Sequence, residues 1–390
     1  MSRSWINSRV QSLKPSGIRK FFDIVAQMDD VVSLGVGEPD FLTPWHVREE
    51  GIYALEKGLT TYTSNSGLLE LREEVSRYLE QQYNLSYRPQ DQVLITVGAS
   101  EAIDLAMRAV IEPGDEVLIP EPSYVSYAPC VILAGGVPVA VPTTNATDFR
   151  LTGSDLESSI TDKSKILVLP YPNNPTGAIM ERHDLADIAR VIDKYDLLVV
   201  SDEIYSELTY GTKHVSIASL PGMYERTLVI NGFSKAFSMT GWRLGYVAGD
   251  PELIAAMTKV HQFTIMCTPT ISQYAAVEAL RNGSESVEMM RSEYDLRRKF
   301  LVHAFRQMGL ECFEPKGAFY VFPSIKSLGM NSEEFCNRLL EEERVAVVPG
   351  TAFGSCGEGH IRVSYAYSLR NLEEAVKRIG RFVHRVRQKQ

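Results

Sequence analysis

Seven short runs of apolar, largely β-branched residues are spaced along the middle of the chain, and helical patterns separate several of them. Residues 100–111 and 185–194 are two of these helical patterns. Strands that alternate with helices form a mostly parallel sheet with helices on both faces. The seven runs are Val93–Val97, Val117–Ile119, Val139–Val141, Ile166–Leu169, Leu197–Ser201, Thr227–Ile230 and Leu244–Ala248. We therefore expect an α/β fold with a mostly parallel seven-stranded sheet.

The last part of the chain has a different pattern. A long charged helical segment begins at about Ser292, and a second helix is expected from Leu369. Between them, short strands are expected near Phe319–Phe322, Val345–Val348 and Ile361–Ser364. This order predicts a second, smaller α+β domain.

Composition excludes several classes of function. The chain has 390 residues and a net charge of −9, which argues against binding to nucleic acid or anionic membranes. No apolar stretch is long enough to cross a bilayer, and residues 1–10 lack a signal-peptide core, so we expect a cytoplasmic protein. The five cysteines form no CxxC pair, which predicts neither a disulfide framework nor a metal site.

Ligands of such sheets bind beyond the carboxyl ends of the strands, and the first polar motif there is Gly98-Ala99-Ser100. Ser100 can cap the helix that follows. The free backbone N–H groups and the helix dipole would also bind an anion. An ordinary capped helix would show the same residues, so both interpretations remain open.

The second motif follows the strand Ile166–Leu169. Its loop, 171–177, contains two prolines that make it rigid, and Asn174 is held extended by the proline after it. A rigid amide can direct a hydrogen bond to a phenolate oxygen. A plain turn would use the same Asn, Pro and Gly residues.

The third motif is Asp202 with Tyr205. Asp202 ends the most apolar strand of the chain, and a carboxylate at such a depth needs a partner. A pyridinium nitrogen is one such partner, and Tyr205 could then reach the oxygen on the same ring. A simple helix cap is the alternative interpretation.

The fourth motif is Lys235, which follows the strand Thr227–Ile230. A lysine becomes a nucleophile toward carbonyl groups when burial or neighbouring cations suppress its charge, and Arg243 is such a cation. Ser234 and Arg243 could hold a phosphate while Lys235 forms an imine with an aldehyde. A surface lysine beside a structural arginine is the plainer alternative.

Together these segments resemble the class I, fold-type I pyridoxal-phosphate aminotransferases of the aspartate aminotransferase superfamily. The resemblance runs from about residue 16 to about residue 382. It rests on Leu34–Asp40, Tyr62, Gly98–Ser100, Asn174–Gly177, Asp202 with Tyr205, Ser234-Lys235, Arg243 and Ile361–Ser364. The segment Pro15–Phe22 is further similar to the subgroup of broad-specificity aromatic and alanine aminotransferases.

The resemblance implies a role for each motif. Lys235 carries the cofactor pyridoxal 5′-phosphate and then shuttles protons, and Asp202 pairs with the pyridine nitrogen. Asn174 and Tyr205 hold the phenolic oxygen, and Tyr124 stacks on the ring. The phosphate is held by Gly98, Ala99, Ser100, Ser234, Arg243 and, from a partner subunit, Tyr62. Substrate carboxylate is bound by Arg362, with help from Gly37 and Asn174.

A site that includes Tyr62 of a second subunit implies an obligate homodimer. The resemblance also implies an N-terminal arm over residues 1–30 and a large cofactor-binding domain over 49–290. The small domain would combine residues 31–48 with residues 291–390.

The segment His261–Thr268 bears on which amino acids the enzyme prefers as substrates. In aspartate-specific relatives this part of the partner subunit offers an arginine, which is absent here. The resemblance also implies that Phe319 and Tyr320 are nearby, so we expect neutral or aromatic L-amino acids, with a 2-oxo acid such as 2-oxoglutarate as acceptor. A β-eliminating C–S lyase shares every cofactor residue and is the alternative. A transcription-regulator sensor domain is a remote one, because no DNA-binding module precedes the arm.

Overall fold

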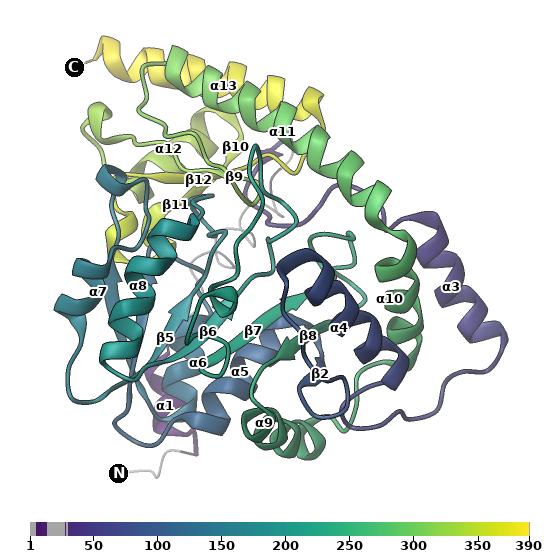
Figure 1. Cartoon of the computed structure of the whole chain (residues 1–390). Coiled ribbons are helices and arrows are strands. Elements are labelled where there is room, and N and C mark those ends of the chain that lie inside the picture. Colours follow the sequence, from purple (N-terminus) through teal and green to yellow (C-terminus); the bar gives the residue numbers. More distant parts are fainter. Residues whose placement is uncertain (1–4, 14–27, 29, 390) are drawn as a thin grey trace.

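The computed structural model describes residues 5–13, 28 and 30–389. The segment Pro15–Phe22 and most of the expected N-terminal arm therefore lie outside the described residues. The chain begins at the lower edge of the molecule in Figure 1 and ends at the opposite edge, on a long C-terminal helix. No helix of the described residues is long and apolar enough to cross a membrane.

The larger part of the molecule is built around a seven-stranded sheet (Figure 1). Its strands, in spatial order, are β2 (Val93–Thr96), β8 (Gly245–Ala248), β7 (Thr227–Gly232), β6 (Leu198–Asp202), β5 (Ser164–Leu169), β3 (Glu116–Glu121) and β4 (Val137–Pro142). Strand β8 is antiparallel to both of its neighbours, and the remaining pairs are parallel. The expected mostly parallel seven-stranded sheet is confirmed, and every predicted run overlaps one of its strands.

Helices cover both faces of this sheet because its strands are apolar on both sides. Val168, Val200 and Leu228 face one helical layer, whereas Leu167 and Val199 face the other. The first layer contains α5 (Gly98–Val110), α6 (Tyr127–Ala134) and α9 (Pro251–Thr264). The second contains α4 (Leu69–Tyr83), α7 (Gly153–Ser159), α8 (Arg182–Lys194) and α10 (Thr270–Asn282), with α3 (Trp45–Glu56) packed on α10. The short α1 (Ser8–Ser12) contacts α6.

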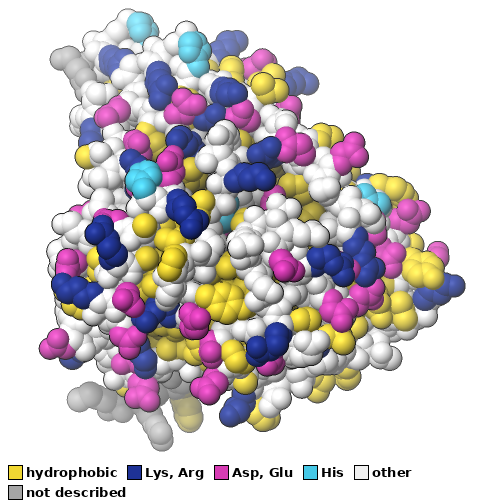
Figure 2. Space-filling model, viewed as in Figure 1, with side chains coloured by type: hydrophobic (Ala, Val, Ile, Leu, Met, Phe, Trp, Pro, Cys, Tyr) yellow, Lys and Arg dark blue, Asp and Glu magenta, His cyan; other side chains and the backbone are white. Residues whose placement is uncertain are grey.

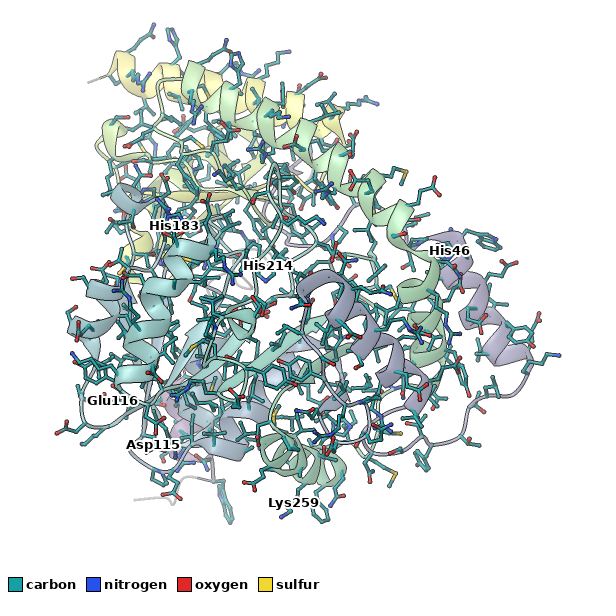
Figure 3. The ribbon with its side chains drawn as sticks, in the orientation of Figure 1. His46, Asp115, Glu116, His183, His214 and Lys259 are labelled. Atoms are coloured by element: carbon teal, nitrogen blue, oxygen red, sulfur yellow. The ribbon has the colours of Figure 1, made fainter. Side chains whose placement is uncertain are left out.

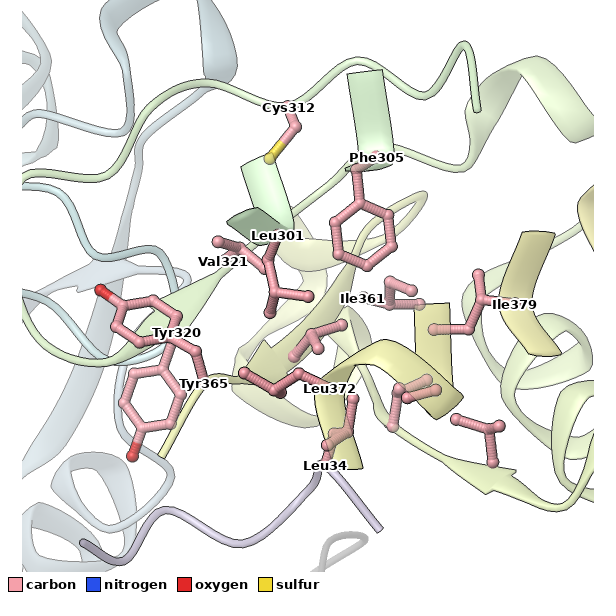
Figure 4. Close-up of a cluster of buried hydrophobic side chains, with 14 of the residues drawn as sticks. Leu34, Leu301, Phe305, Cys312, Tyr320, Val321, Ile361, Tyr365, Leu372 and Ile379 are labelled. Atoms are coloured by element: carbon pink, nitrogen blue, oxygen red, sulfur yellow. The ribbon is translucent and has the colours of Figure 1, made fainter. Parts of the chain in front are cut away.

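The C-terminal part has its own hydrophobic core (Figure 4). Leu301 and Phe305 lie there on α11 (Ser284–Gln307), which begins before the expected Ser292. The other helices are α12 (Ser332–Glu343) and α13 (Leu369–Gln388), and the strands are β1 (Val32–Ser33), β9 (Tyr320–Val321), β10 (Val345–Ala346), β11 (Val348–Pro349) and β12 (Ile361–Ser364). The short strands and terminal helix predicted for this region are present.

Residues 32–38 run from this core toward the carboxyl ends of the parallel strands of the large sheet. β1 pairs with β10, and Leu34 is fully buried beside Leu372 in Figure 4. The backbone of Leu34 bonds to Ala346 and Ser364. This pairing fixes the next residues, 35–38, at the boundary between the C-terminal core and the large sheet.

Candidate active site

A cavity of about 690 Å³ lies beyond the carboxyl ends of the parallel strands. Residues that follow β5, β6 and β7 line it, as such topology predicts. The structure brings these predicted residues together in its wall: Gly37, Gly98, Ala99, Ser100, Tyr124, Asn174, Asp202, Tyr205, Ser234, Lys235, Arg243 and Arg362. Tyr62 is not among the lining residues, and its side chain is 79% exposed.

Lys235 projects into this cavity from the turn after β7. Its Nζ donates a hydrogen bond of 2.7 Å to the carbonyl oxygen of Gly37. Burial lowers the pKa of the Lys235 ammonium to about 8, and the charges of Arg362 and Arg243 act in the same direction, partly opposed by Glu38. A substantial fraction of the amine is therefore neutral near physiological pH, as a nucleophile toward carbonyl groups requires.

Asp202 is the last residue of β6 and is buried at the cavity wall. Burial raises the pKa of its carboxyl group. Two donors oppose that shift, because Oδ2 accepts a 2.7 Å hydrogen bond from Tyr127 and Oδ1 accepts one from the Ile204 N–H. The carboxylate is thus held in one orientation inside a shielded site.

Tyr205 and Tyr320 form the side of the cavity that faces the C-terminal core. Their hydroxyl groups lie 2.9 Å apart in a hydrogen bond. A Cβ atom added to Gly37 would lie only 2.2 Å from the hydroxyl oxygen of Tyr320, which is too close for any side chain to fit. Glycine at position 37 therefore lets the backbone approach this pair closely.

Arg362 lies on β12 and is 3% exposed. The central carbon of its guanidinium group lies over the rings of Tyr320 and Phe353, at 4.5 Å and 4.7 Å from the respective ring centroids. Nη1 donates to Asn174 Oδ1 at 2.9 Å, Nη2 donates to the Gly35 carbonyl, and Nε has no partner within the described chain. A buried, oriented guanidinium of this kind matches a carboxylate.

The N-terminus of α5 provides a place for an anion. Gly98 begins this helix with a φ of +77°, and a Cβ there would lie 3.0 Å from Nη2 of Arg243. The expected helix cap by Ser100 is wrong, because the helix starts at Gly98 and Val97 occupies the cap position without a side-chain bond. Glycine's tolerance of positive φ allows that earlier start. The N–H groups of this turn and Arg243 remain suited to a phosphate.

Sequence reasoning missed Tyr127, the first residue of α6. It lines the cavity and packs edge-on against Tyr124, with ring centroids 5.6 Å apart. The spacing of three residues from Tyr124, at the start of a helical segment, was the available signal. Thr240 and Glu38, which are hydrogen-bonded to each other at the cavity wall, were also missed.

The expected cofactor fits these residues. A phosphate matches the α5 N-terminus with Arg243, and a pyridinium nitrogen matches the buried carboxylate of Asp202. The aldehyde matches the amine of Lys235, whose pKa of about 8 suits imine formation.

Comparisons with known proteins agree on one family. The profile described as "Aminotransferase class I and II" matches residues 29–379. The aspartate aminotransferase of Pyrococcus abyssi is 49% identical over 96% of this chain and 97% of its own length. The aromatic-amino-acid aminotransferase 2 of Thermococcus litoralis is 46% identical, with the same coverage. The crystal structure of the aromatic aminotransferase from Pyrococcus horikoshii superimposes with a TM-score of 0.90 at 46% identity, over 95% of this chain and 99% of that one.

Proposed function

We propose residue roles and a substrate preference for this chain, which belongs to the class I and II aminotransferase family. It is a fold-type I, pyridoxal-phosphate-dependent enzyme that transfers an amino group from an amino acid to a 2-oxo acid. Pyridoxal phosphate, when bound, supplies an aldehyde for the amino group and a ring that accepts electrons from the substrate α carbon. The lyase and regulator alternatives gain no support from these relatives.

The observation that carries the residue roles is the meeting of three groups in one cavity: the Lys235 amine, the buried Asp202 carboxylate and the Arg362 guanidinium. Lys235 would hold the cofactor through its neutral amine and would move a proton at the substrate α carbon. Asp202, oriented by Tyr127, holds a proton on the pyridine nitrogen. Arg362 binds the α-carboxylate, with Asn174 beside it.

The side-chain preference is for neutral and aromatic amino acids. Among the described residues that line the cavity, the cations are Lys235, Arg243 and Arg362, and each already has one of the roles above. A carboxylate in the substrate side chain therefore has no further cation to bind among the described residues that line the cavity. Tyr124 and Tyr320 offer aromatic surface instead.

The enzyme is a homodimer in which Tyr62 completes the partner's site. Tyr62 is exposed, and so is Phe263, at 84%. The two segments adjoin, because Asn65 donates to the carbonyl oxygen of Met266 and Thr270 to that of Thr61. An exposed apolar surface of this kind supports contact with a second copy.

A survey of half-reactions tests the substrate proposal. The purified, cofactor-loaded enzyme is mixed rapidly with each amino acid, and the absorbance of the bound cofactor is followed. Aromatic and neutral amino acids should react about tenfold faster than aspartate, since an unpaired buried carboxylate costs more than 1.4 kcal/mol. Fastest reaction with aspartate would contradict the preference, and release of pyruvate and ammonia from cysteine conjugates would favour the lyase.

A further inference from the structure

A second cavity, of about 590 Å³, lies between α4, α10, the start of α11 and the segment that follows β6. It shares two chain segments with the candidate active site. Tyr205 lines the first cavity, whereas Ser206 and Glu207 line the second. Lys235 likewise lines the first cavity, and Phe237 lines the second. The second cavity thus lies directly behind residues of the active site.

Its wall contains a carboxylate beside aromatic rings. Oε1 of Glu207 accepts hydrogen bonds from the hydroxyl groups of Tyr78 and Tyr83, the latter at 3.0 Å. Oε2 has no partner among the residues that the structure describes. The rings of Tyr78 and Tyr83 pack edge to face, and Tyr83 packs in the same way against His214. A carboxylate with a free oxygen and aromatic neighbours is suited to an organic ammonium group.

Among the residues that the structure describes, the same wall carries one cation without a partner. Arg281 and Arg77 are bound by Glu74, and Arg291 is bound by Glu288. Figure 2 shows such basic and acidic side chains interspersed over α4 and α10. Lys213, in contrast, is exposed, and within the described chain its Nζ has no hydrogen-bond or ion-pair partner. As far as the described residues go, the wall therefore offers one free positive charge and one free carboxylate oxygen.

Hydrogen bonds join the wall of this second cavity to the segments that carry the active-site residues. Asn231, near the end of β7, donates a 2.9 Å hydrogen bond to the Ser206 hydroxyl. His214, near the centre of the molecule in Figure 3, bonds through Nε2 to the buried carboxylate of Glu203, which follows Asp202. The wall of the second cavity is therefore preformed, because these hydrogen bonds hold Ser206 and His214 in place.

We propose that this cavity is a second binding site, for a small zwitterion with an ammonium group and a carboxylate, such as a free amino acid. The ammonium group bonds to Oε2 of Glu207 beside the tyrosine rings, and the carboxylate pairs with Lys213. The volume suits a ligand of this size. This site is separate from the substrate site, which uses Arg362.

L-Proline is the probe, because its secondary nitrogen keeps two N–H donors and cannot be transferred. Radiolabelled proline is equilibrated with the holoenzyme by dialysis. Proline should bind, and Glu207→Gln and Lys213→Met should each weaken binding about tenfold, since each removes a charge-assisted contact. Pyrrolidine, which lacks the carboxylate, and propionate, which lacks the ammonium group, should compete at least about tenfold less well.

Matched controls separate this site from the active site. Glu80→Gln lies on α4 outside the cavity, and Lys259→Met lies on α9, distant from His214 in Figure 3. Both variants, and Arg362→Lys, should bind proline as the wild type does. Absence of proline binding to the wild type overturns the proposal. So does binding that survives both Glu207→Gln and Lys213→Met but is lost in Arg362→Lys. Because Lys213 is exposed, its variant stays informative if Glu207→Gln fails to fold.

Discussion

The hydroxyl group of Tyr127 donates a 2.7 Å hydrogen bond to Oδ2 of Asp202, and both side chains are buried. This bond favours the ionised carboxylate, whereas burial disfavours it. In the role proposed above, Asp202 supports the protonated pyridine nitrogen only while it is ionised. Under that proposal, Tyr127 is a positioning residue that acts through Asp202.

Tyr127→Phe should lower kcat about tenfold, because a hydrogen bond to a charged group contributes about 1.5–3 kcal/mol. Its loss raises the pKa of Asp202 further, so the acidic limb of the kcat/KM profile should move to higher pH. The pH profile is the measurement, since a purely structural role would leave its position unchanged. Tyr124→Phe keeps the Tyr127–Asp202 bond and serves as the control.

Asp202→Asn should slow the half-reaction about a hundredfold or more, as removal of an electrostatic partner in a shielded site does. Asparagine keeps the side-chain shape and can still accept the bond from Tyr127. The rate is measured in single-turnover experiments with cofactor-saturated protein. A normal rate in this variant would exclude the electrostatic role.

The lowered pKa of Lys235 sets the pH dependence of cofactor capture. Only the neutral amine attacks an aldehyde, so capture by the cofactor-free protein should accelerate as the pH rises and reach half its maximum near pH 8. An ordinary lysine would place this midpoint near 10.5. Rates are followed by absorbance, and borohydride reduction then maps the adduct. Lys235→Ala should form no adduct, and an adduct on another lysine would refute the assignment.

Arg362→Lys should weaken all substrates together, by roughly 2–4 kcal/mol in kcat/KM, because lysine cannot reproduce the two parallel hydrogen bonds to a carboxylate. Selectivity should hardly change, and the cofactor absorbance should persist. The measurement is kcat/KM for several amino acids with different side chains. A loss confined to one class would mean that Arg362 contacts the side chain instead.

Tyr62 can be assigned to its subunit by mixing inactive variants. If Tyr62 serves the partner's site, a hybrid dimer of Lys235→Ala and Tyr62→Ala chains contains one intact site. Activity at limiting cofactor should therefore return when the two variants are dissociated and reassembled together. No recovery, despite hybrids seen by native mass spectrometry, would place Tyr62 in its own subunit's site.

The sequence by itself determined the seven strands and the motifs at their ends. Strand positions follow from local apolar runs, and parallel strands bring their carboxyl ends to one edge. Asp202 and Lys235 could be predicted as candidate site residues for that reason, and both line the cavity. The local pattern gave a wrong prediction at Ser100, which does not cap the helix. Gly98 adopts a positive φ, and the helix therefore starts at Gly98.

Only the tertiary structure decided which side chains meet across distant segments. Tyr127 reaches Asp202 through the packing of α6 on the sheet, and Phe353 reaches Arg362 from the hydrophobic cluster that also contains Leu167 and Val199. The pairing of Tyr205 with Tyr320 joins residues more than a hundred positions apart. Such contacts depend on how packed layers place side chains in three dimensions, and no periodicity along the chain records that. The free carboxylate oxygen of Glu207 became visible for the same reason.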